Sequence, residues 1–235
     1  MHALLTGVRP RGDLVVMPTS TWHNLEVERR ERVLDAAMAE FGAHGYSAGS
    51  LNVIARNAGV AKGSLFQYFT DKFDFYAHVT EHVAAQVRAA MQPWLVLPAG
   101  RPFAEFLLDG VMAWIDYFGS HPVQRGVTAA TMLEMDPTVR AAVRTPVHRM
   151  YGEGLRPLLE QARQVGELPA DTDLEIVLAM LVMVLPQLAL APFEPGLDPV
   201  IPLYGKTSAE LRAPVRRLLG ATLRGDPRWS TTTSS

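Results

Sequence analysis

The chain has 235 residues, of which 48% are apolar, a formal net charge of −2 and no cysteine. The absence of cysteine excludes disulfides, thiolate zinc sites and thiol nucleophiles, and it suits a reducing cytoplasm. The near-neutral net charge does not by itself indicate a polyanionic partner such as a nucleic acid, although binding to a polyanion needs only one basic face.

The first 25 residues are expected to form a flexible arm. Their apolar runs are short and are interrupted by glycine and proline, which is not typical of a secretory signal peptide. Helical periodicity begins only around Glu26, and Met17 is an alternative candidate for the natural first residue. We therefore expect the folded part to begin at Glu26.

Nearly every later segment has the apolar spacing of an amphipathic helix, and none has the alternation of a strand. In the first such segment, Val33, Ala37 and Phe41 share one face. The predicted helices cover about 26–45, 51–58, 62–69, 72–94, 102–119, 123–134, 138–166, 173–191 and 207–224. Pro146 and Pro157 are expected to break or bend the longest of them. The predicted fold class is therefore all-α.

Pro98, Gly100 and Pro102 mark a joint between a compact helical head and a larger, more apolar helical body. Within the body, the run Ile176–Ala191 approaches the length of a membrane span. It is shorter than the roughly 20 apolar residues that a span needs, and it contains Pro186. We therefore expect no membrane association, but a helix buried on two sides, against the core and against a partner.

The stretch Ala58–Phe69 reads AGVAKGSLFQYF and has the spacing of a helix-turn-helix. Gly59 supplies the positive φ that the turn needs. Val60 and Leu65 are expected to be buried where the two helices meet. The second helix would present its first residues to the major groove of DNA, and Gln67 is the side chain best suited to read a base edge.

The segment from Val27 to about His82 resembles the DNA-binding head of the TetR family of transcriptional regulators, in which a phrase such as IARNAGVAKGSLFQYFTDK is a signature. The residues in register with the signature are Gly59, Val60, Gly63, Leu65, Tyr68, Phe69 and Lys72. The resemblance implies an all-α homodimer whose last two long helices pair into a four-helix bundle. It also implies a small-molecule pocket in the body that controls the spacing of the two heads.

The resemblance further implies which residues contact DNA. They are Ser50, Asn52, Lys62, Gly63, Ser64, Gln67, Tyr68 and Lys72, and Phe66 is added because its flat apolar ring suits sugars and thymine methyl groups. Ser50 and Lys72 match phosphate contacts, whereas Asn52 and Gln67 match base contacts. For Tyr68, a place in the core is an equally good interpretation.

Two positions depart from the family pattern. Ala61 stands where a hydroxyl cap is common, and Phe66 stands where tyrosine is usual, so two backbone hydrogen bonds are expected to be missing. Acidic and basic residues nearly balance in the head. We therefore expect modest non-specific affinity for DNA and a shallow salt dependence.

With this resemblance, the chain divides into four predicted parts. These are a flexible arm (1–25), a helix-turn-helix DNA-binding domain (26–72), a ligand-binding and dimerisation domain (73–226) and a disordered polar tail (227–235).

Aromatic residues and methionines of the body could line an adaptable apolar pocket. The candidates are Trp114, Tyr117, Phe118, His121, Met132, Met150, Tyr151, Met180 and Met183. Packing in the core is the alternative for most of them. Because Arg125 and Arg149 are the few cationic residues nearby, an uncharged or weakly anionic apolar effector is favoured over a sugar.

A zinc-dependent hydrolase is the alternative function. His78, Glu81 and His82 form an H-x-x-E-H pattern, with both histidines on one helical face and Glu153 as a third candidate ligand. Two histidines on a solvated helix face explain the same residues without a metal.

The sequence thus favours a cytoplasmic, non-enzymatic regulator without a cofactor. We expect a repressor that binds a pseudo-palindromic DNA operator as a homodimer and is released by a small apolar effector.

Overall fold

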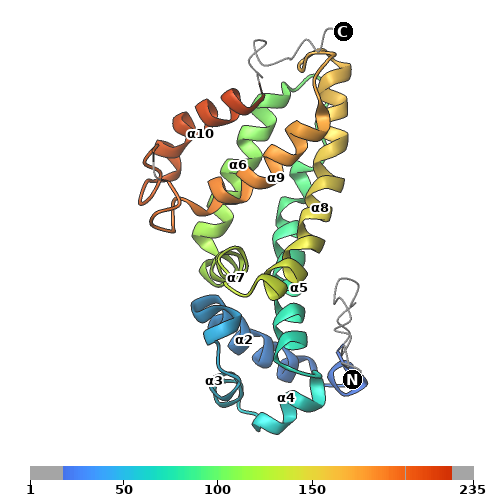
Figure 1. The fold of residues 1–235 in the computed structure, drawn as a ribbon, viewed down its shortest axis with the longest axis vertical. Helices are drawn as coiled ribbons and strands as arrows, with labels where there is room; N and C mark the ends of the chain where they lie inside the picture. Colours follow the sequence, from blue (N-terminus) through green and yellow to red (C-terminus); the bar gives the residue numbers. More distant parts are fainter. Residues whose placement is uncertain (1–17, 199, 224–235) are drawn as a thin grey trace, which may run out of the picture. The chain divides into compact units, whose positions relative to one another are not determined.

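The computed structural model describes residues 18–198 and 200–223. Every regular element within these residues is helical, which confirms the predicted all-α fold (Figure 1). The helices are α1 (Ser20–His23), α2 (Val27–Ala48), α3 (Leu51–Asn57), α4 (Lys62–Tyr68), α5 (Lys72–Met91), the 3-10 helix η2 (Gln92–Trp94), α6 (Phe103–Ser120), α7 (Pro122–Met132), α8 (Pro137–Gln164), α9 (Leu174–Leu190) and α10 (Ser208–Leu223).

The chain forms two compact units. Unit 1 comprises the described residues within Met1–Val83 together with Gly126–Pro146, and unit 2 comprises Ala84–Arg125 together with the described residues after Pro146. This division differs from the predicted boundary after residue 72. The first half of α5 and the α7–α8 connection both belong to the compact unit that carries the helix-turn-helix.

Unit 1 is built on an aromatic core between α2 and α5. Phe41 of α2 is fully buried, and its ring meets those of Phe75 and Tyr76 edge-on, at centroid distances of 5.8 and 5.1 Å. Edge-to-face pairs add to the stabilisation from burial. Gly42 continues this helix at a close approach, since a Cβ there would lie 3.1 Å from the backbone nitrogen of Val127.

The folded part begins before Glu26, which corrects part of the predicted flexible arm. Thr19 starts the short helix α1, and Trp22 within it is only 2% exposed. The indole ring packs against Phe69 at 4.9 Å between centroids. The remaining arm residues 1–17 and the predicted disordered tail 227–235 lie outside the described residues.

Unit 2 is organised around α6, which packs against both α9 and α10. Its buried face carries Phe103, Leu108 and Ile115, each at most 2% exposed. A helix with an apolar stripe of this kind is stabilised chiefly by packing against its neighbours.

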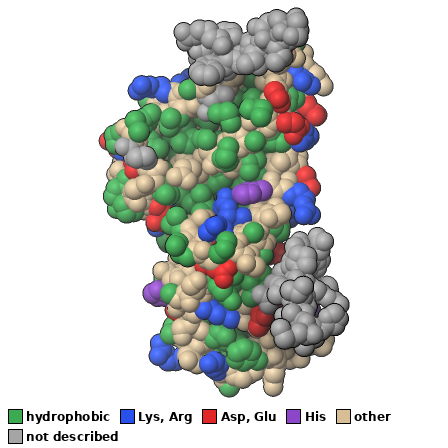
Figure 2. Space-filling model, viewed as in Figure 1, with side chains coloured by type: hydrophobic (Ala, Val, Ile, Leu, Met, Phe, Trp, Pro, Cys, Tyr) green, Lys and Arg blue, Asp and Glu red, His purple; other side chains and the backbone are tan. Residues whose placement is uncertain are grey.

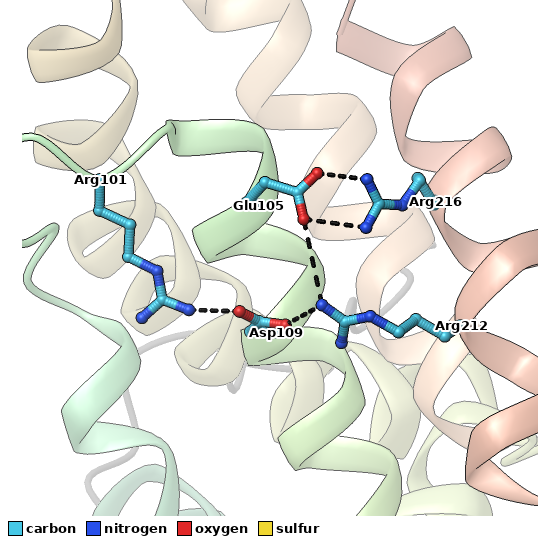
Figure 3. Close-up of polar contacts among 5 residues, drawn as sticks. All are labelled: Arg101, Glu105, Asp109, Arg212 and Arg216. Atoms are coloured by element: carbon cyan, nitrogen blue, oxygen red, sulfur yellow. Dashed lines mark hydrogen bonds and ion pairs between the residues drawn. The ribbon is translucent and has the colours of Figure 1, made fainter.

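A network of ion pairs joins α10 to α6 (Figure 3). Asp109 of α6 accepts hydrogen bonds from Arg101 and, at 2.5 Å, from Arg212 of α10. The Glu105 carboxylate accepts hydrogen bonds from both terminal nitrogens of Arg216, one of them at 3.0 Å. Linked charges of this type fix geometry more effectively than isolated surface pairs do. The network therefore sets the position of α10 on α6.

Prolines lie inside two helices of the body. α8 continues through Pro146 and Pro157, so of the predicted breaks or bends no break is present, because each proline removes one backbone bond while the flanking turns keep theirs. α9 likewise contains Pro186. None of the helices in the described ranges is long and apolar enough to cross a membrane.

His78 of α5 makes the stability of unit 1 depend on pH. Its ring lies against Trp22 and Phe69, and burial, together with nearby His82 and His23, lowers its pKa to about 4. An unfolded histidine titrates near about 6.5, so the unfolded chain binds more protons between these two values. Stability that is present above pH 6.5 is therefore lost progressively as the pH falls toward 4.

We expect His78→Phe to remove about 1–2 kcal/mol of this acid destabilisation, a figure reduced for solvent screening. Denaturant unfolding at pH 7.5, 6 and 5 would measure it. The matched control is His44→Gln, at a histidine whose side chain is 55% exposed. Equal pH slopes for wild type and His78→Phe would contradict this account.

Candidate nucleic-acid interface and ligand cavity

α3 and α4 are joined by a tight turn at Gly59, whose φ is +67°. The turn is closed by the Val60 amide, which donates to the Ala55 carbonyl at 2.9 Å. A residue with a side chain would pay a conformational cost at this φ. Ile54 and Leu65 are 0% and 2% exposed beneath the turn, so the predicted helix-turn-helix is present.

α4 exposes one face and buries the other. Lys62, Gly63 and Gln67 are exposed, and Phe66 is 50% exposed, whereas Leu65 is buried. Ser64, at the edge of the exposed face, is half-buried. The exposed face combines a cation, an open backbone approach, an aromatic surface and an amide, which are the groups that contact phosphates and bases.

Tyr68 does not belong to this exposed face, and its predicted contact with DNA is corrected. Its side chain is 2% exposed, and its ring packs against that of Trp22 at 5.8 Å. Tyr68 lies three residues after Leu65, so both side chains point to the underside of the helix. The core interpretation of this tyrosine is the one that the structure supports.

The N-terminus of α3 carries Ser50 and Asn52. The Ser50 hydroxyl accepts a hydrogen bond from the Val53 amide at 3.4 Å and caps the helix. Its own amide donates to a carboxylate oxygen of Glu40 at 2.8 Å. Asn52 is exposed in the first turn. Both residues are therefore placed where a helix N-terminus can meet a phosphate or a base.

α4 begins without a side-chain cap, as its sequence predicts. Ala61 occupies the N-cap position and makes no side-chain bond. A Cβ added to Gly63 would find no atom within 4 Å, so the backbone there is open to a close partner. The Ser64 amide donates to the Ala61 carbonyl at 2.9 Å, which leaves the amides of Lys62 and Gly63 for an anion.

Lys72 starts α5, but its ammonium group turns back onto unit 1. Nζ donates to the Ser47 carbonyl at 3.4 Å and lies 4.9 Å from the centre of the Tyr46 ring. Burial lowers the pKa of Lys72, while the charges of Glu134 and Glu40 act in the opposite direction. An ammonium has three donors, so further donors remain for a phosphate.

Glu134, in the α7–α8 connection, fixes the end of α2. It is 4% exposed, and its carboxylate accepts from the Tyr46 amide at 3.0 Å and the Ser47 hydroxyl at 2.9 Å. Burial alone would raise its pKa, but hydrogen bonds from Asp136, Ser47 and Tyr46 outweigh burial and lower it. This charged group therefore holds the segment that leads into the Ser50 cap.

The zinc alternative finds no support. His78 is partly buried against aromatic rings, rather than on a solvated face, and His82 is half-buried. Glu81 is exposed on α5. Among residues 18–198 and 200–223, no three histidine or carboxylate side chains are grouped so that they could hold a metal ion.

Unit 2 contains a cavity of about 570 Å³ between α5, η2, α6, α8 and α9. Three predicted residues, Trp114, Met150 and Tyr151, line it. Its charged lining residues are Arg88 and Glu153, both exposed, while the remaining walls are mainly apolar. Volume and lining are those of a site for a small, mainly apolar molecule.

The other predicted pocket residues do not line this cavity. Phe118 is fully buried in the core, and the Tyr117 ring stacks on His121 at 4.1 Å. Met180 and Met183 are 37% and 66% exposed. The remaining residue, Met132, ends α7 within unit 1.

The sequence did not indicate Trp94 and Phe106, which line the cavity together with Gly110. The side chain of Trp94 packs directly over Gly110, since a Cβ there would lie in ordinary contact, 3.4 Å from the Cβ of Trp94. The guanidinium of Arg101 lies over the Trp94 and Phe106 rings at 5.7 and 5.4 Å. The spacing of Phe106, Gly110 and Trp114 at i, i+4 and i+8 is the signal that could have identified this wall.

Trp114 carries an unpaired polar group in this wall. The residue is 7% exposed, and its indole Nε1–H is buried without an acceptor. A buried donor without a partner costs about 1–3 kcal/mol. An acceptor supplied by a molecule in the cavity would remove that cost.

Two family models match the chain. Residues 33–79 match the bacterial regulatory proteins of the TetR family, and residues 107–199 match a tetracyclin repressor-like C-terminal domain. An all-α chain with an N-terminal helix-turn-helix and a separate helical body is the architecture of these regulators. The chain belongs to the TetR family.

Curated relatives match mainly over the helix-turn-helix. The regulator AcrR of Shigella flexneri is 39% identical over 54 residues, covering 23% of this chain and 25% of the relative. The repressor KstR of Rhodococcus jostii is 43% identical over 49 residues, covering 21% and 23%. The matches thus span about a quarter of these relatives' own length.

Solved structures match over most of the fold. The regulator FadR of Bacillus subtilis, in complex with stearoyl-CoA, has a TM-score of 0.65 and 20% identity, covering 83% of this chain and 99% of that one. FadR of Bacillus halodurans, a fatty acid degradation regulator, has a TM-score of 0.61 and 21% identity, covering 86% and 98%.

Proposed function

We propose that this chain is a cytoplasmic transcriptional repressor that binds a pseudo-palindromic DNA operator as a homodimer. A small apolar effector in the cavity of unit 2 releases it from DNA. The observation that carries the proposal is the exposed face of α4, where Lys62, Gly63, Phe66 and Gln67 stand above the buried Leu65.

DNA binding follows from the chemistry of that face. A glutamine can pair with both hydrogen-bonding groups of adenine in the major groove, which is worth about 1–3 kcal/mol against a wrong base. Lys62 and the uncapped amides of α4 suit phosphates, as do Ser50 and Lys72. Asn52, exposed on α3, is the second candidate for a base. Two such heads would meet operator half-sites roughly 34–36 Å apart.

The dimer is proposed to form through α9 and α10. Ile176, Met180 and Met183 are 59%, 37% and 66% exposed, and their spacing places them on one face of α9. Figure 2 shows hydrophobic side chains gathered over the part of unit 2 that carries α9 and α10. An exposed apolar face of this kind marks an interaction surface, and a second copy of the same helices would cover it.

The effector is proposed to be an apolar molecule with at least one hydrogen-bond acceptor, since the cavity is mainly apolar and the Trp114 N–H lacks a partner. A long-chain acyl group joined to a carbonyl has this chemistry. The structural neighbour from Bacillus subtilis holds stearoyl-CoA, which supports an acyl compound as the first probe. An effector shifts the protein between two states by its differential affinity for them.

Selection of bound sequences from random duplex DNA, with the purified full chain, tests the proposal. We expect one pseudo-palindromic site. On this site Gln67→Ala should lose about tenfold in affinity and relax the base preference, because a base contact is removed. Lys62→Ala should weaken operator and scrambled DNA alike and reduce the salt slope by about one, because a phosphate contact is removed.

Gly63→Ala distinguishes a loss of DNA affinity from a loss of folding stability. Alanine favours a helix over glycine by up to about 1 kcal/mol, and the space around Gly63 is open, so the protein should unfold at a higher temperature. DNA affinity should nevertheless fall, because the added methyl group obstructs the phosphate backbone.

Selection of no sequence by the wild type would refute the proposed function.

Met183→Glu should prevent dimer formation, because it places a charge in the centre of the proposed interface. Sedimentation velocity would show a monomer where the wild type sediments as a dimer. The matched control is Met135→Glu, at a methionine that is 82% exposed in unit 1, which should stay dimeric. A dimeric Met183→Glu protein would mean that another surface forms the dimer.

Trp114→Phe should weaken effector binding about threefold to tenfold, because it removes one donor and keeps an aromatic ring in the wall. Titration calorimetry with stearoyl-CoA measures the loss, and free coenzyme A shows whether the acyl part is required. Trp94→Phe, in the same cavity, is the control for changing an indole. If stearoyl-CoA binds equally to wild type and Trp114→Phe, the assigned role of the indole N–H is wrong.

A further inference from the structure

α4 is a helix that cannot hold its own shape. It has seven residues, no side-chain cap at Ala61, no acidic residue in its first turn and no basic residue in its last. Isolated helices shorter than about 12–15 residues are marginal in water. Other segments of unit 1 must therefore hold the helix in its conformation. A segment that contacts one end of α4 also fixes the backbone from which the exposed side chains at that end project.

The C-terminal end of α4 is held by Thr19, a residue 48 positions earlier in the chain. The Thr19 hydroxyl donates to the Gln67 carbonyl at 2.6 Å, and the Thr19 amide donates to the Tyr68 carbonyl at 3.0 Å. The last carbonyls of a helix have no partner within it. Thr19 thus satisfies two adjacent carbonyls of the final turn.

Thr19 does this at the expense of its own helix. It is the N-cap residue of α1, a position at which a threonine hydroxyl normally accepts a bond from an amide of the first turn. Here the hydroxyl makes no cap bond to α1. It bonds to the Gln67 carbonyl of α4 instead.

Trp22 anchors this contact. The indole is 2% exposed and packs against Tyr68 and Phe69, the last residue of α4 and the one that follows it. The Trp22 amide also donates to the Thr19 carbonyl at 3.0 Å, so ring and hydroxyl belong to one rigid turn. Thr19 therefore has a fixed position against the end of α4.

We infer that Thr19 is a positioning residue for base recognition, held in place by Trp22. The inference rests on the proposed function, because it concerns how Gln67 meets DNA. Thr19 binds the backbone carbonyl of Gln67, whose exposed side chain is the proposed base reader. Without this bond the last turn samples other conformations, and only the fraction with a correctly placed Gln67 can read the base.

Phosphate contacts depend less on this bond. Lys62 and Gly63 lie in the first turn of α4, at the opposite end from Gln67. Contacts with phosphates supply non-specific affinity, whereas base contacts supply the preference for one sequence. Loss of the Thr19 bond should therefore reduce the preference for the operator and leave the affinity for other DNA unchanged.

The test compares Thr19→Val with Thr19→Ser in the full chain. Valine keeps the shape and the backbone amide but removes the hydroxyl, and serine retains the hydroxyl. Affinities are measured for the selected operator and for a scrambled duplex of equal length. We expect Thr19→Val to lose about threefold to tenfold on the operator only, and Thr19→Ser to restore the wild-type ratio.

Two further measurements separate positioning from folding. Amide hydrogen exchange should be faster at the end of α4 in Thr19→Val than in the wild type. Thr21→Val, at an exposed threonine of the same short helix, should leave both exchange and affinities unchanged.

An unchanged operator-to-scrambled ratio in Thr19→Val would overturn the inference, whatever its melting temperature, because a merely structural role affects both affinities equally. If the wild type prefers no sequence at all, the proposed function fails as well. Failure of the inference alone is recognised by a wild type that selects an operator and a Thr19→Val variant that selects it equally well.

Discussion

The arrangement of unit 1 depends on one constraint, which is that a seven-residue helix must be held from outside. Leu65 is buried against α3, Tyr68 is buried against α1, and the φ of +67° at Gly59 sets the entry of the helix. Because these two side chains bury the underside of α4 against its neighbours, the polar and aromatic residues of the opposite face are left exposed. Packing and the candidate interface are thus two consequences of the same helix.

The helix-turn-helix could be predicted from the sequence, since its evidence is local. The spacing of Ile54, Val60 and Leu65 and the position of Gly59 need only a short window. α1 could not be predicted in this way, because a four-residue helix has no period to recognise. Its stability comes from Trp22 meeting Phe69 and from Thr19 meeting Gln67, and neither contact leaves a pattern in the sequence.

The cavity shows a second limit of sequence reasoning. Aromatic residues on α6 were recognised as a group, but their separation into cavity wall and core depends on how far along the helix the cavity reaches. Trp114 lines the cavity and Phe118, one turn later, is fully buried. Met180 and Met183 are of a residue type that often lines apolar pockets, but both are exposed, as residues of a protein–protein interface are in the free protomer. Composition predicts that a residue is apolar, whereas its neighbours decide what covers it.

Polar contacts fix both ends of the helix-turn-helix, and both come from segments distant in the chain. Glu134 holds the turn before Ser50 with a carboxylate whose pKa is lowered, and Thr19 holds the end of α4. The same carboxylate acts on Lys72 through its charge, so part of that cation's field is compensated within the protein. The net charge of unit 1 therefore adds little to its affinity for DNA. The base contacts proposed for Gln67 and Asn52 therefore require that these side chains be held accurately, and that accuracy depends on hydrogen bonds that the two helices cannot make by themselves.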